Sequence, residues 1–423
     1  MKIPLTITQA SCADDYDPNS MPVAKARAII RQFLEPVSGV MRAPIRSALG
    51  RVLAADVTSP VDVPAHRNSA MDGWAFCAAD LAASGDTTLA EIGASFAGRP
   101  FAGTLGKGQC VRIFTGGVVP KGADTVVMQE KAKSGGKSIA IASGQKKGQH
   151  VRHAGEDLQK GAVALARGRA IRPAELGLLA SLGIGEVSVY RPLRVAFFST
   201  GDELRSIGTP LGEGEIYDSN RYTIYGMLAR LGCDVLDMGV VRDDPALLEQ
   251  AFRDAAANAD VVITSGGVSV GEADFVKQLM DKLGEVVFWK IAMKPGRPLA
   301  YGKIAGAHFF GLPGNPVSVM VTFYQFVREA LLTLQGVSPV PPLPMLNALC
   351  TTAIKKAPGR TEFQRGILGT DASGAWTVRT TGEQGSGILK SMSDANCFII
   401  LGESMGNVEA GSMVDVQVIE GLV

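Results

Sequence analysis

The chain has 423 residues, and its 42 Lys and Arg against 41 Asp and Glu leave a formal net charge of +1. This balance excludes an overall field that would attract nucleic acid or an anionic membrane. No apolar run reaches the roughly 18 residues that a membrane span needs. The length exceeds what one hydrophobic core usually serves, so two to four domains are expected.

The N-terminal segment and the cysteines favour a cytoplasmic protein. Met1–Ser20 has no apolar stretch and carries three aspartates, so we expect a loose tail and not a signal peptide. The six cysteines are spread over the whole chain without a Cys-x-x-Cys pair. This spacing favours reduced thiols over a disulfide framework or a zinc site.

The first predicted element is a helix that begins at Met21, with Ser20 as its cap, and ends before Pro36. A short strand is expected around Val52–Val57. Ser59–Pro64 contains two prolines, which stiffen the backbone, so it is predicted to be an extended linker.

Short strands separated by glycines follow and predict an all-β module. Its strands are expected at Gln109–Phe114, Thr125–Gln129 and Ser138–Ala142. Ser134–Ser138 resembles the end of a P-loop, but Lys131 occupies the place of the leading glycine. A hairpin tip is therefore predicted there.

Asn68–Ala75 is predicted to be an exposed turn that leads into a strand, because Asp72-Gly73 is a strong turn signal. On turn chemistry alone, the favoured interpretation is that Asp72 only initiates this turn. A functional role for its carboxylate needs further support.

A change of periodicity after Leu193 predicts a parallel sheet with helices on both faces, whose ligands lie beyond the carboxyl ends of the strands. A helix at Arg172–Leu182 and a strand at Glu186–Tyr190 precede this change. The expected strands are Arg194–Ser199, Val235–Val241, Ala259–Thr264, Val286–Ile291 and Ala307–Gly311, and the expected helices are Ser219–Leu231, Pro245–Ala257, Glu272–Leu283 and Pro316–Leu334.

Within this region, Val261–Asp274 has the pattern of strand, glycine turn and helix. Ser265, Gly266 and Gly267 follow the buried strand, and such a turn directs backbone amides at an anion. Asp274 adds a carboxylate beside them. The alternative is that the glycine pair only makes a tight connection, which is the commoner meaning of such a pair alone.

Polar residues end every predicted strand of the sheet, and in a parallel sheet these ends meet at one edge. Taken alone, Asp244 and Asn220 among them look like helix caps. Amides, lysines and an arginine at this edge can hold phosphate or another oxyanion. Carboxylates would repel such a ligand unless Mg²⁺ lay between them. The edge therefore predicts an anionic ligand with a divalent metal, and its polar segments are Ser199–Glu203, Asp218–Asn220, Arg242–Asp244, Ser265–Asp274, Lys290–Pro298 and Gly311–Pro316.

The last part of the chain is predicted to be a small β-barrel domain. Ser338–Pro344 is a proline-rich linker. Strands are expected after it at Glu362–Leu368, Trp376–Thr380, Cys397–Leu401 and Met413–Ile419.

Several motifs in fixed order resemble molybdopterin molybdenumtransferases, the family of bacterial MoeA and the gephyrin E domain. The molybdopterin-binding domain of the family is matched by Ser199–Leu204, Val262–Asp274, Lys294–Leu299 and Gly311–Ser318, and the adjoining family segments by Asn68–Ala75, Phe114–Gly117 and Gly155–Asp157. The resemblance runs from about Met21 to the C-terminus. Trp74 departs from the tyrosine that is common in the family.

The resemblance implies a multidomain α/β and β fold with a three-layer molybdopterin-binding domain. The expected parts are a discontinuous N-terminal mixed domain at 21–58 and 151–190, a β module at 59–150 inserted in it, the α/β domain at 191–337 and a C-terminal β-barrel at 345–423. It also implies an elongated homodimer whose active site combines the α/β domain of one subunit with the β module of the other.

The activity implied by the resemblance is a step of molybdenum cofactor biosynthesis. The enzyme would bind adenylated molybdopterin and molybdate, cleave the adenylate with Mg²⁺, insert the metal into the dithiolene and release AMP. A transient contact with the molybdopterin adenylyltransferase is a further partner to consider.

Site residues are carried over by matching positions. The expected catalytic residues are Asp72, Asp157, Glu203, Asp243 and Asp274, of which Glu203, Asp243 and Asp274 are expected to bind the metal. The expected substrate-binding residues are Thr115, Arg152, Ser265, Gly266, Gly267, Ser269, Lys290, Lys294, Arg297, Pro313, Pro316 and Ser386. The resemblance, and not the spacing, raises Asp72 from a turn residue to a site residue.

Two other functions compete with this one. A molybdopterin adenylyltransferase has a similar α/β domain but needs neither Asn68–Ala75 nor the C-terminal barrel. A non-enzymatic scaffold, like the gephyrin E domain in its binding of receptor peptides, would not need the acids and lysines of the site.

Overall fold

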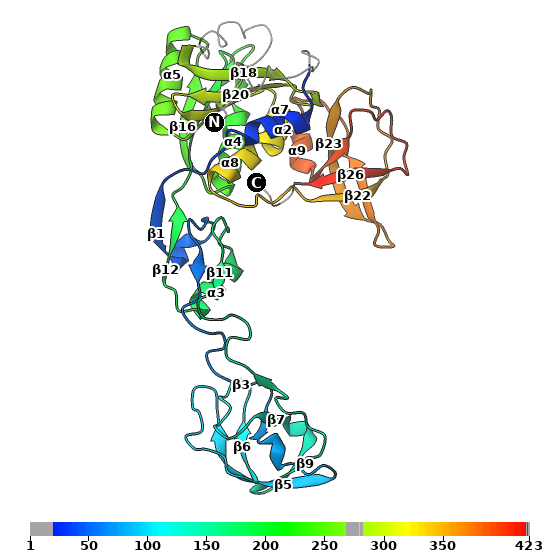
Figure 1. Cartoon of the computed structure of the whole chain (residues 1–423). Helices are drawn as coiled ribbons and strands as arrows, with labels where there is room; N and C mark the ends of the chain where they lie inside the picture. Colours follow the sequence, from blue (N-terminus) through cyan, green and yellow to red (C-terminus); the bar gives the residue numbers. More distant parts are fainter. Residues whose placement is uncertain (1–19, 268–278, 280–281, 420, 422–423) are drawn as a thin grey trace, which may run out of the picture.

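The computed structural model describes residues 20–267, 279, 282–419 and 421. The chain is elongated, with a six-stranded mixed sheet and a barrel at one end and a β module at the other (Figure 1). A small mixed part, which contains β1, β12 and α3, lies between them (Figure 1). This architecture confirms the predicted multidomain α/β and β fold.

The small mixed part is built on an antiparallel pair of strands, β1 (Val40–Pro44) and β12 (Glu186–Tyr190). A two-stranded ladder of β2 (Val57–Thr58) and β11 (Val163–Leu165) and the short helix η1 (Ile45–Ala48) complete it. Helix α3 (Pro173–Ser181) packs here through Leu179.

The N-terminus of α3 is fixed by a buried carboxylate. Glu175 accepts a hydrogen bond from the Arg172 backbone N–H at 3.0 Å and forms ion pairs with Arg169 and Arg172. Only 4% of Glu175 is exposed, and the Arg172 and Arg169 hydrogen bonds lower its pKa to about 2.

The β module is a sheet in the order β7-β4-β6-β5-β9-β8. The predicted hairpin tip is confirmed, because Gly135 pairs with Ser138 across the turn. The strands are β4 (Gly73–Phe76), β5 (Asp86–Ser95), β6 (Gln109–Ile113), β7 (Thr125–Met128), β8 (Ala132–Gly135) and β9 (Ser138–Ala142), with the short helices η2 (Ala78–Asp80) and η3 (Gln129–Lys131).

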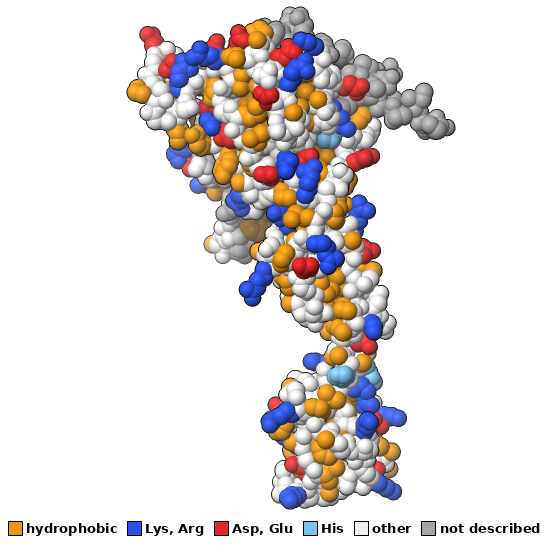
Figure 2. Space-filling view, turned by 90° about the vertical axis from the view of Figure 1, so that its left-hand side faces the viewer, with side chains coloured by type: hydrophobic (Ala, Val, Ile, Leu, Met, Phe, Trp, Pro, Cys, Tyr) orange, Lys and Arg blue, Asp and Glu red, His pale blue; other side chains and the backbone are white. Residues whose placement is uncertain are grey.

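A neck of two chain segments joins the β module to the mixed part. The entering strand β3 (Asn68–Ser69) pairs antiparallel with the leaving strand β10 (Val151–Arg152), and Val63 bridges Leu158 next to them. Figure 2 shows the molecule narrowing above the module, with histidine side chains at the narrow point.

The large sheet has the order β16-β13-β17-β21-β20-β18, and the prediction of a purely parallel sheet was wrong. Strand β20 runs antiparallel to both of its neighbours, because the chain reverses between Lys294 and Pro298. The other strands are mutually parallel, so their carboxyl ends still meet at one edge. The strands are β13 (Arg194–Thr200), β16 (Asp234–Val241), β17 (Val261–Ser265), β18 (Gly284–Lys290), β20 (Pro298–Ile304) and β21 (Ala307–Leu312).

Alternating side chains of β13 divide the core between the two faces of this sheet, as strand geometry requires. Phe197 packs on the face that α4 (Ser219–Arg230) covers, and Phe198 packs on the face of α5 (Pro245–Asn258). These helices and the sheet confirm the three-layer prediction. Asp244 caps α5, as expected, by accepting bonds from the Ala246 and Leu247 N–H groups.

A helix at Pro316–Leu334 forms the centre of the face that α4 covers. It consists of α7 (Pro316–Thr322), one π-helical turn η4 (Phe323–Val327) and α8 (Arg328–Leu334). By length and composition alone, this helix could span a membrane, although the sequence contains no uninterrupted apolar run of that length. However, 78% of its most apolar window is buried inside the protein. Its apolar composition is that of a core helix.

Helix α2 (Val23–Arg31) packs beside the Pro316–Leu334 helix. It begins two residues later than predicted, with Pro22 at the N-cap position and no side-chain cap bond. The expected cap by Ser20 is therefore wrong. The Met21 N–H instead donates to Lys290 O at 2.7 Å, which attaches this part of the chain to the large sheet.

The C-terminal strands close into the predicted barrel, because β23 pairs with both β24 and β25. Strand β19 (Met293–Lys294) of the large domain also pairs with β23, so the sheet and the barrel share main-chain contacts. The barrel comprises β22 (Met345–Cys350), β23 (Thr361–Thr370), β24 (Trp376–Thr380), β25 (Cys397–Leu401) and β26 (Met413–Val418), with helix α9 (Lys390–Asp394).

Candidate functional site

A cavity of about 690 Å³ lies at the carboxyl edge of the large sheet, where the ligand site was expected. We call it the rim cavity. The strand ends β13, β16, β17 and β21 contribute to it, and so does the barrel through Gly387 and Leu389. The predicted site residues that line it are Glu203, Asp243, Ser265, Gly266, Gly267, Pro313 and Pro316.

Glu203 follows β13 and folds back over Gly201. A Cβ atom at position 201 would lie 2.6 Å from Glu203 Oε2, and Gly201 has a φ of +149°. Glycine is therefore needed for this turn. Asp243, which follows β16, is the second exposed carboxylate on the rim cavity.

The glycine turn after β17 approaches the end of β13 closely. Gly266 has a φ of +95°, and a Cβ atom there would lie 2.5 Å from Thr200 O. Its N–H donates to Leu312 O at 3.1 Å, so the hydrogen-bonding of the sheet continues past the strand. The Gly266 amide is therefore not available to a phosphate, which corrects the expectation that all three amides of this turn face the ligand.

Asn220 links three loops of the rim cavity and was missed as a site residue. Its Nδ2 donates to Ser265 Oγ at 2.8 Å and to Gly314 O at 2.6 Å. The Ser265 hydroxyl in turn donates to Pro313 O at 3.3 Å. Asn220 looked like a helix cap in the sequence, but Asp218 caps α4 by accepting a bond from the Arg221 N–H.

Several oxygens of residues that line the rim cavity are buried without a hydrogen-bond partner among the described residues. They are Thr200 Oγ1, Asp218 Oδ2 and Asn220 Oδ1. Buried polar atoms are normally paired, so each marks a place where a further polar group is expected. These residues lie in the polar segments Ser199–Glu203 and Asp218–Asn220, which the sequence placed at this edge, but no pattern singled them out as site residues within those segments.

The predicted cations Lys290, Lys294 and Arg297 are exposed at the same edge of the sheet. Lys290 ends β18, Lys294 ends β19, and Arg297 directly precedes β20, whose first residue, Pro298, lines the rim cavity. Lys294 Nζ lies 3.6 Å from Glu362 Oε1 of β23. Part of the charge of Lys294 therefore compensates a buried carboxylate of the barrel.

Ser386 is also brought to this region by the barrel. Its backbone oxygen accepts a hydrogen bond from the Val317 N–H at 3.1 Å, at the start of α7. This contact sets the loop that contains Gly387 against the rim cavity.

In the β module, Asp72 and Thr115 form one unit. The Thr115 backbone N–H and hydroxyl donate to Asp72 Oδ1 at 2.7 and 2.8 Å. These bonds, the backbone one first, lower the pKa of Asp72, so it is a carboxylate near neutral pH. The hydrogen bonds fix the position of the Asp72 carboxylate against Thr115 on the surface of the β module.

Arg152 and Asp157 lie on the leaving segment of the neck, and both side chains are exposed. Arg152 pairs with Asn68 in the ladder of β3 and β10, and the Asp157 N–H donates to Val63 O at 2.9 Å. Figure 1 shows the neck strand β3 and the β module towards the opposite end of the molecule from the large sheet. One chain therefore does not bring these residues to the rim cavity.

Two predicted site residues, Ser269 and Asp274, lie outside the described residues. Among the residues that the structure does describe, no three His, Cys, Asp or Glu side chains form a group that could hold a metal ion. Glu203 and Asp243 nevertheless line the same cavity.

Comparisons with protein families cover most of the chain. Residues 21–183 match the MoeA N-terminal region (domain I and II), residues 196–333 the probable molybdopterin binding domain, and residues 347–419 the MoeA C-terminal region (domain IV).

Individual relatives agree with these family matches. A molybdopterin molybdenumtransferase of Haemophilus influenzae is 46% identical over 374 residues, which cover 88% of this chain and 92% of the relative. Gephyrin of Dictyostelium discoideum is 33% identical, over 94% of this chain and 62% of that protein. The crystal structure of a moeA protein from Pyrococcus horikoshii OT3 covers 95% of this chain and 100% of its own, with a TM-score of 0.82 and 28% identity. The chain therefore belongs to the MoeA family of molybdopterin molybdenumtransferases, which act in molybdenum cofactor biosynthesis.

Proposed function

We propose that the chain inserts molybdate into adenylated molybdopterin, with Mg²⁺-dependent cleavage of the adenylate and release of AMP. The observation that carries the proposal is the rim cavity, which combines two exposed carboxylates with a glycine turn in a chain of this family. Its volume of about 690 Å³ lies within the range of cavities that bind small ligands.

The residues of the rim cavity fit a Mg²⁺ ion that is shared with the substrate. Mg²⁺ is usually bound through one or two carboxylates, together with substrate phosphates and water. Glu203 and Asp243 would supply the carboxylates, with Asp274 as the third proposed ligand. The bound ion would neutralise charge on the phosphate oxygens.

The side chains around the carboxylates would position the substrate. Asn220 holds Ser265 and Gly314, and Ser265 holds Pro313, so the wall of the cavity is set before ligand binds. Gly267 and Ser269 would contact the phosphates, and Lys290, Lys294 and Arg297 would attract the anionic groups of substrate and molybdate. Pro316 and Ser386 would border the site on the side of the barrel.

We further propose that the active site is shared between two subunits. Asp72 and Thr115 lie in the β module and Arg152 and Asp157 in the neck, whereas the rim cavity lies at the other end of the elongated chain. A homodimer that sets the β module of one subunit against the rim cavity of the other would combine these groups. Asp72 would then supply a carboxylate near the reacting centre.

Two expectations from the sequence stay part of the proposal. The boundaries 21–58 with 151–190, 59–150, 191–337 and 345–423 are proposed as the domains of the chain, with helix α2 of the first domain packed on the α/β domain. A cytoplasmic location is supported by the cysteines, because every cysteine among the described residues is a free thiol.

The test is a reconstituted reaction. Purified protein is mixed with adenylated molybdopterin, molybdate and Mg²⁺, and both AMP and mature cofactor are measured over time. AMP and cofactor should appear together and require all three additions. Binding of the substrate without either product would refute the proposed reaction.

A further inference from the structure

We propose that a second cavity, lined by Arg27, Arg31 and Arg328, binds a small organic oxyanion, meaning a carboxylate or phosphate group on an apolar body. This inference is independent of the reaction proposed above.

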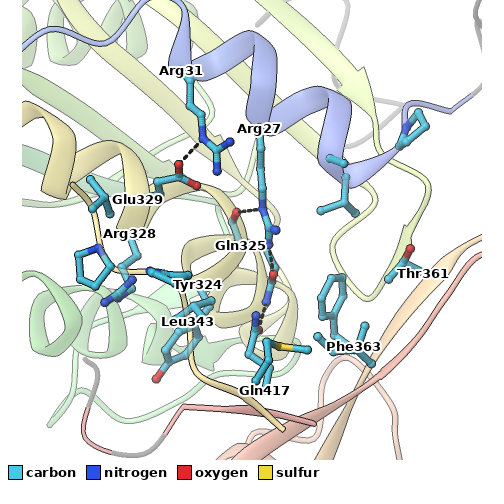
Figure 3. Close-up of a pocket in the computed structure, with 18 of the residues that line it drawn as sticks. Arg27, Arg31, Tyr324, Gln325, Arg328, Glu329, Leu343, Thr361, Phe363 and Gln417 are labelled. Atoms are coloured by element: carbon cyan, nitrogen blue, oxygen red, sulfur yellow. Dashed lines mark hydrogen bonds and ion pairs between the residues drawn. The ribbon is translucent and has the colours of Figure 1, made fainter. Parts of the chain in front are cut away.

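The second cavity lies between helices and the barrel, away from the rim cavity. It has a volume of about 530 Å³ and is bordered by α2, the Pro316–Leu334 helix, the linker 340–343 and strands of the barrel. Figure 3 shows Arg27 and Arg31 reaching into it from α2, and Tyr324, Gln325 and Arg328 from the helix opposite.

Arg328 forms no ion pair with any of the residues that the structure describes. Its side chain lines the cavity and only 7% of the residue is exposed. Its Nε is also buried without a hydrogen-bond partner among those residues. A buried charge without a partner is strongly unfavourable, so an anion from outside the chain would be stabilised here. Burial also lowers the pKa of Arg328.

The other two arginines have partners and hold the cavity in shape. Arg31 forms an ion pair with Glu329. Arg27 Nε donates to Gln325 O at 2.7 Å, and Gln325 Nε2 donates to Gln417 Oε1 of β26 at 2.7 Å (Figure 3). This chain of bonds joins α2, the central helix and the barrel.

The charge and shape of the lining define the class of ligand. Three arginines and two glutamates, Glu329 and Glu403, line the cavity, which leaves one positive charge. The planar guanidinium of Arg328 suits a carboxylate or phosphate, which it can bind through two parallel hydrogen bonds. Leu343, Met345 and Phe363 give the cavity an apolar wall on which the remainder of such a ligand would lie.

Three probes test separately the contribution of the guanidinium and the contribution of the apolar wall to binding. Phenyl phosphate, inorganic phosphate and benzyl alcohol are titrated into the full-length protein by calorimetry at constant pH and ionic strength. Phenyl phosphate should bind at least tenfold more tightly than inorganic phosphate, and benzyl alcohol should not bind measurably. Equal affinities for the two phosphates would overturn the proposed apolar wall, and binding of neither would overturn the site.

Variants then locate the binding. Arg328→Met should weaken phenyl phosphate at least tenfold, whereas Arg253→Met, on the exposed face of α5, should leave it unchanged. Leu343→Ala should weaken phenyl phosphate and spare inorganic phosphate. Unchanged binding of phenyl phosphate by both cavity variants would place the ligand elsewhere and refute the proposal.

Thermal unfolding distinguishes a ligand site from a structural arginine. Without added anion, Arg328→Met should unfold at the same temperature as the unsubstituted protein or a higher one, because an unpaired buried charge is removed. Phenyl phosphate should raise the unfolding temperature of the unsubstituted protein only. A variant that melts lower and is still stabilised by phenyl phosphate would show that Arg328 has only a structural role.

Discussion

The side-chain amide of Asn220 donates to Ser265 Oγ at 2.8 Å and so connects the start of α4 with the end of β17. The same amide donates to Gly314 O at 2.6 Å. Three loops that lie far apart in the sequence are therefore held in one arrangement by one side chain. That arrangement is the wall of the rim cavity.

Replacing Asn220 with Ala should disturb the cavity more than the fold. Two hydrogen bonds are lost, at a cost of about 1–2 kcal/mol in the free energy of unfolding. We expect the rate of AMP release to fall at least tenfold, because the loop positions are no longer fixed. The control is Asn258→Ala at the exposed end of α5, which should affect neither quantity. Full activity of Asn220→Ala would remove Asn220 from the site.

The carboxylates Glu203 and Asp243 should set the requirement for Mg²⁺. We expect Glu203→Gln and Asp243→Asn each to raise the Mg²⁺ concentration for half-maximal AMP release about tenfold or more, since a neutral amide is a weaker ligand. Glu213→Gln, on an exposed loop nearby, serves as the matched control. If the variants need no more Mg²⁺ than the unsubstituted protein, the two carboxylates do not bind it.

Lys294 and Glu362 should show coupled effects on stability. Only 4% of Glu362 is exposed, and Lys294 Nζ lies 3.6 Å from its Oε1. Lys294→Met should lower the free energy of unfolding by about 1–3 kcal/mol, because a buried carboxylate loses its cation. Adding Glu362→Gln should recover at least half of that loss in a double-mutant cycle. Additive losses would show that the two charges do not interact.

Glu175 should make the stability of the chain depend on pH in the acid range. Its pKa falls from 4.5 to about 2 in the folded protein, so its carboxylate stabilises the fold above pH 4.5. That contribution is lost as the pH falls from 4.5 towards 2. Glu175→Gln should be less stable by about 2 kcal/mol near neutral pH.

Chemical denaturation at several pH values measures this effect. The difference in unfolding free energy between the unsubstituted protein and Glu175→Gln should shrink steadily below about pH 4.5. The exposed substitution Glu186→Gln should show no comparable trend. A difference that stays constant with pH would contradict the lowered pKa.

Complementation between inactive variants tests the shared active site. Asp72→Asn and Asp243→Asn should each lose most activity as separate proteins. Mixed after dissociation and reassociation, they should regain up to about a quarter of the unsubstituted activity, because a hybrid dimer contains one intact site. Mass spectrometry confirms that hybrids form. Hybrids without activity would refute a site built from both subunits.

The sequence predicted the layers of the large domain better than the direction of every strand. Consecutive Phe197 and Phe198 lie in an apolar run that only a strand buried on both faces can satisfy, so β13 was recognisable. Strand β20 was missed because Gly302 and Lys303 interrupt its apolar pattern, and because Pro295 precedes it and Pro298 begins it. Its antiparallel direction depends on a turn between Lys294 and Pro298 that only tertiary packing reveals.

The candidate site was likewise predicted from the sequence only in part. Polar strand ends predicted the position of the rim cavity, and the family resemblance selected Glu203 and Asp243 in it. Asn220 was mistaken for a cap because asparagine is common there. Asp218 takes that place instead, which leaves the Asn220 amide free to bind Ser265 and Gly314. Residue patterns also do not give the distance between domains, so they could not show that Asp72 lies far from the rim cavity of its own chain.

The pairing of β19 with β23 decides which parts of the molecule can move separately. Main-chain bonds between the large sheet and the barrel, together with the bond from Val317 to Ser386, make a rotation of the barrel costly. The β module is attached only through the two segments of the neck and their short ladder. Hinge motion is therefore easiest at the neck, and in the proposed homodimer it would let the β module of one subunit approach the rim cavity of the other.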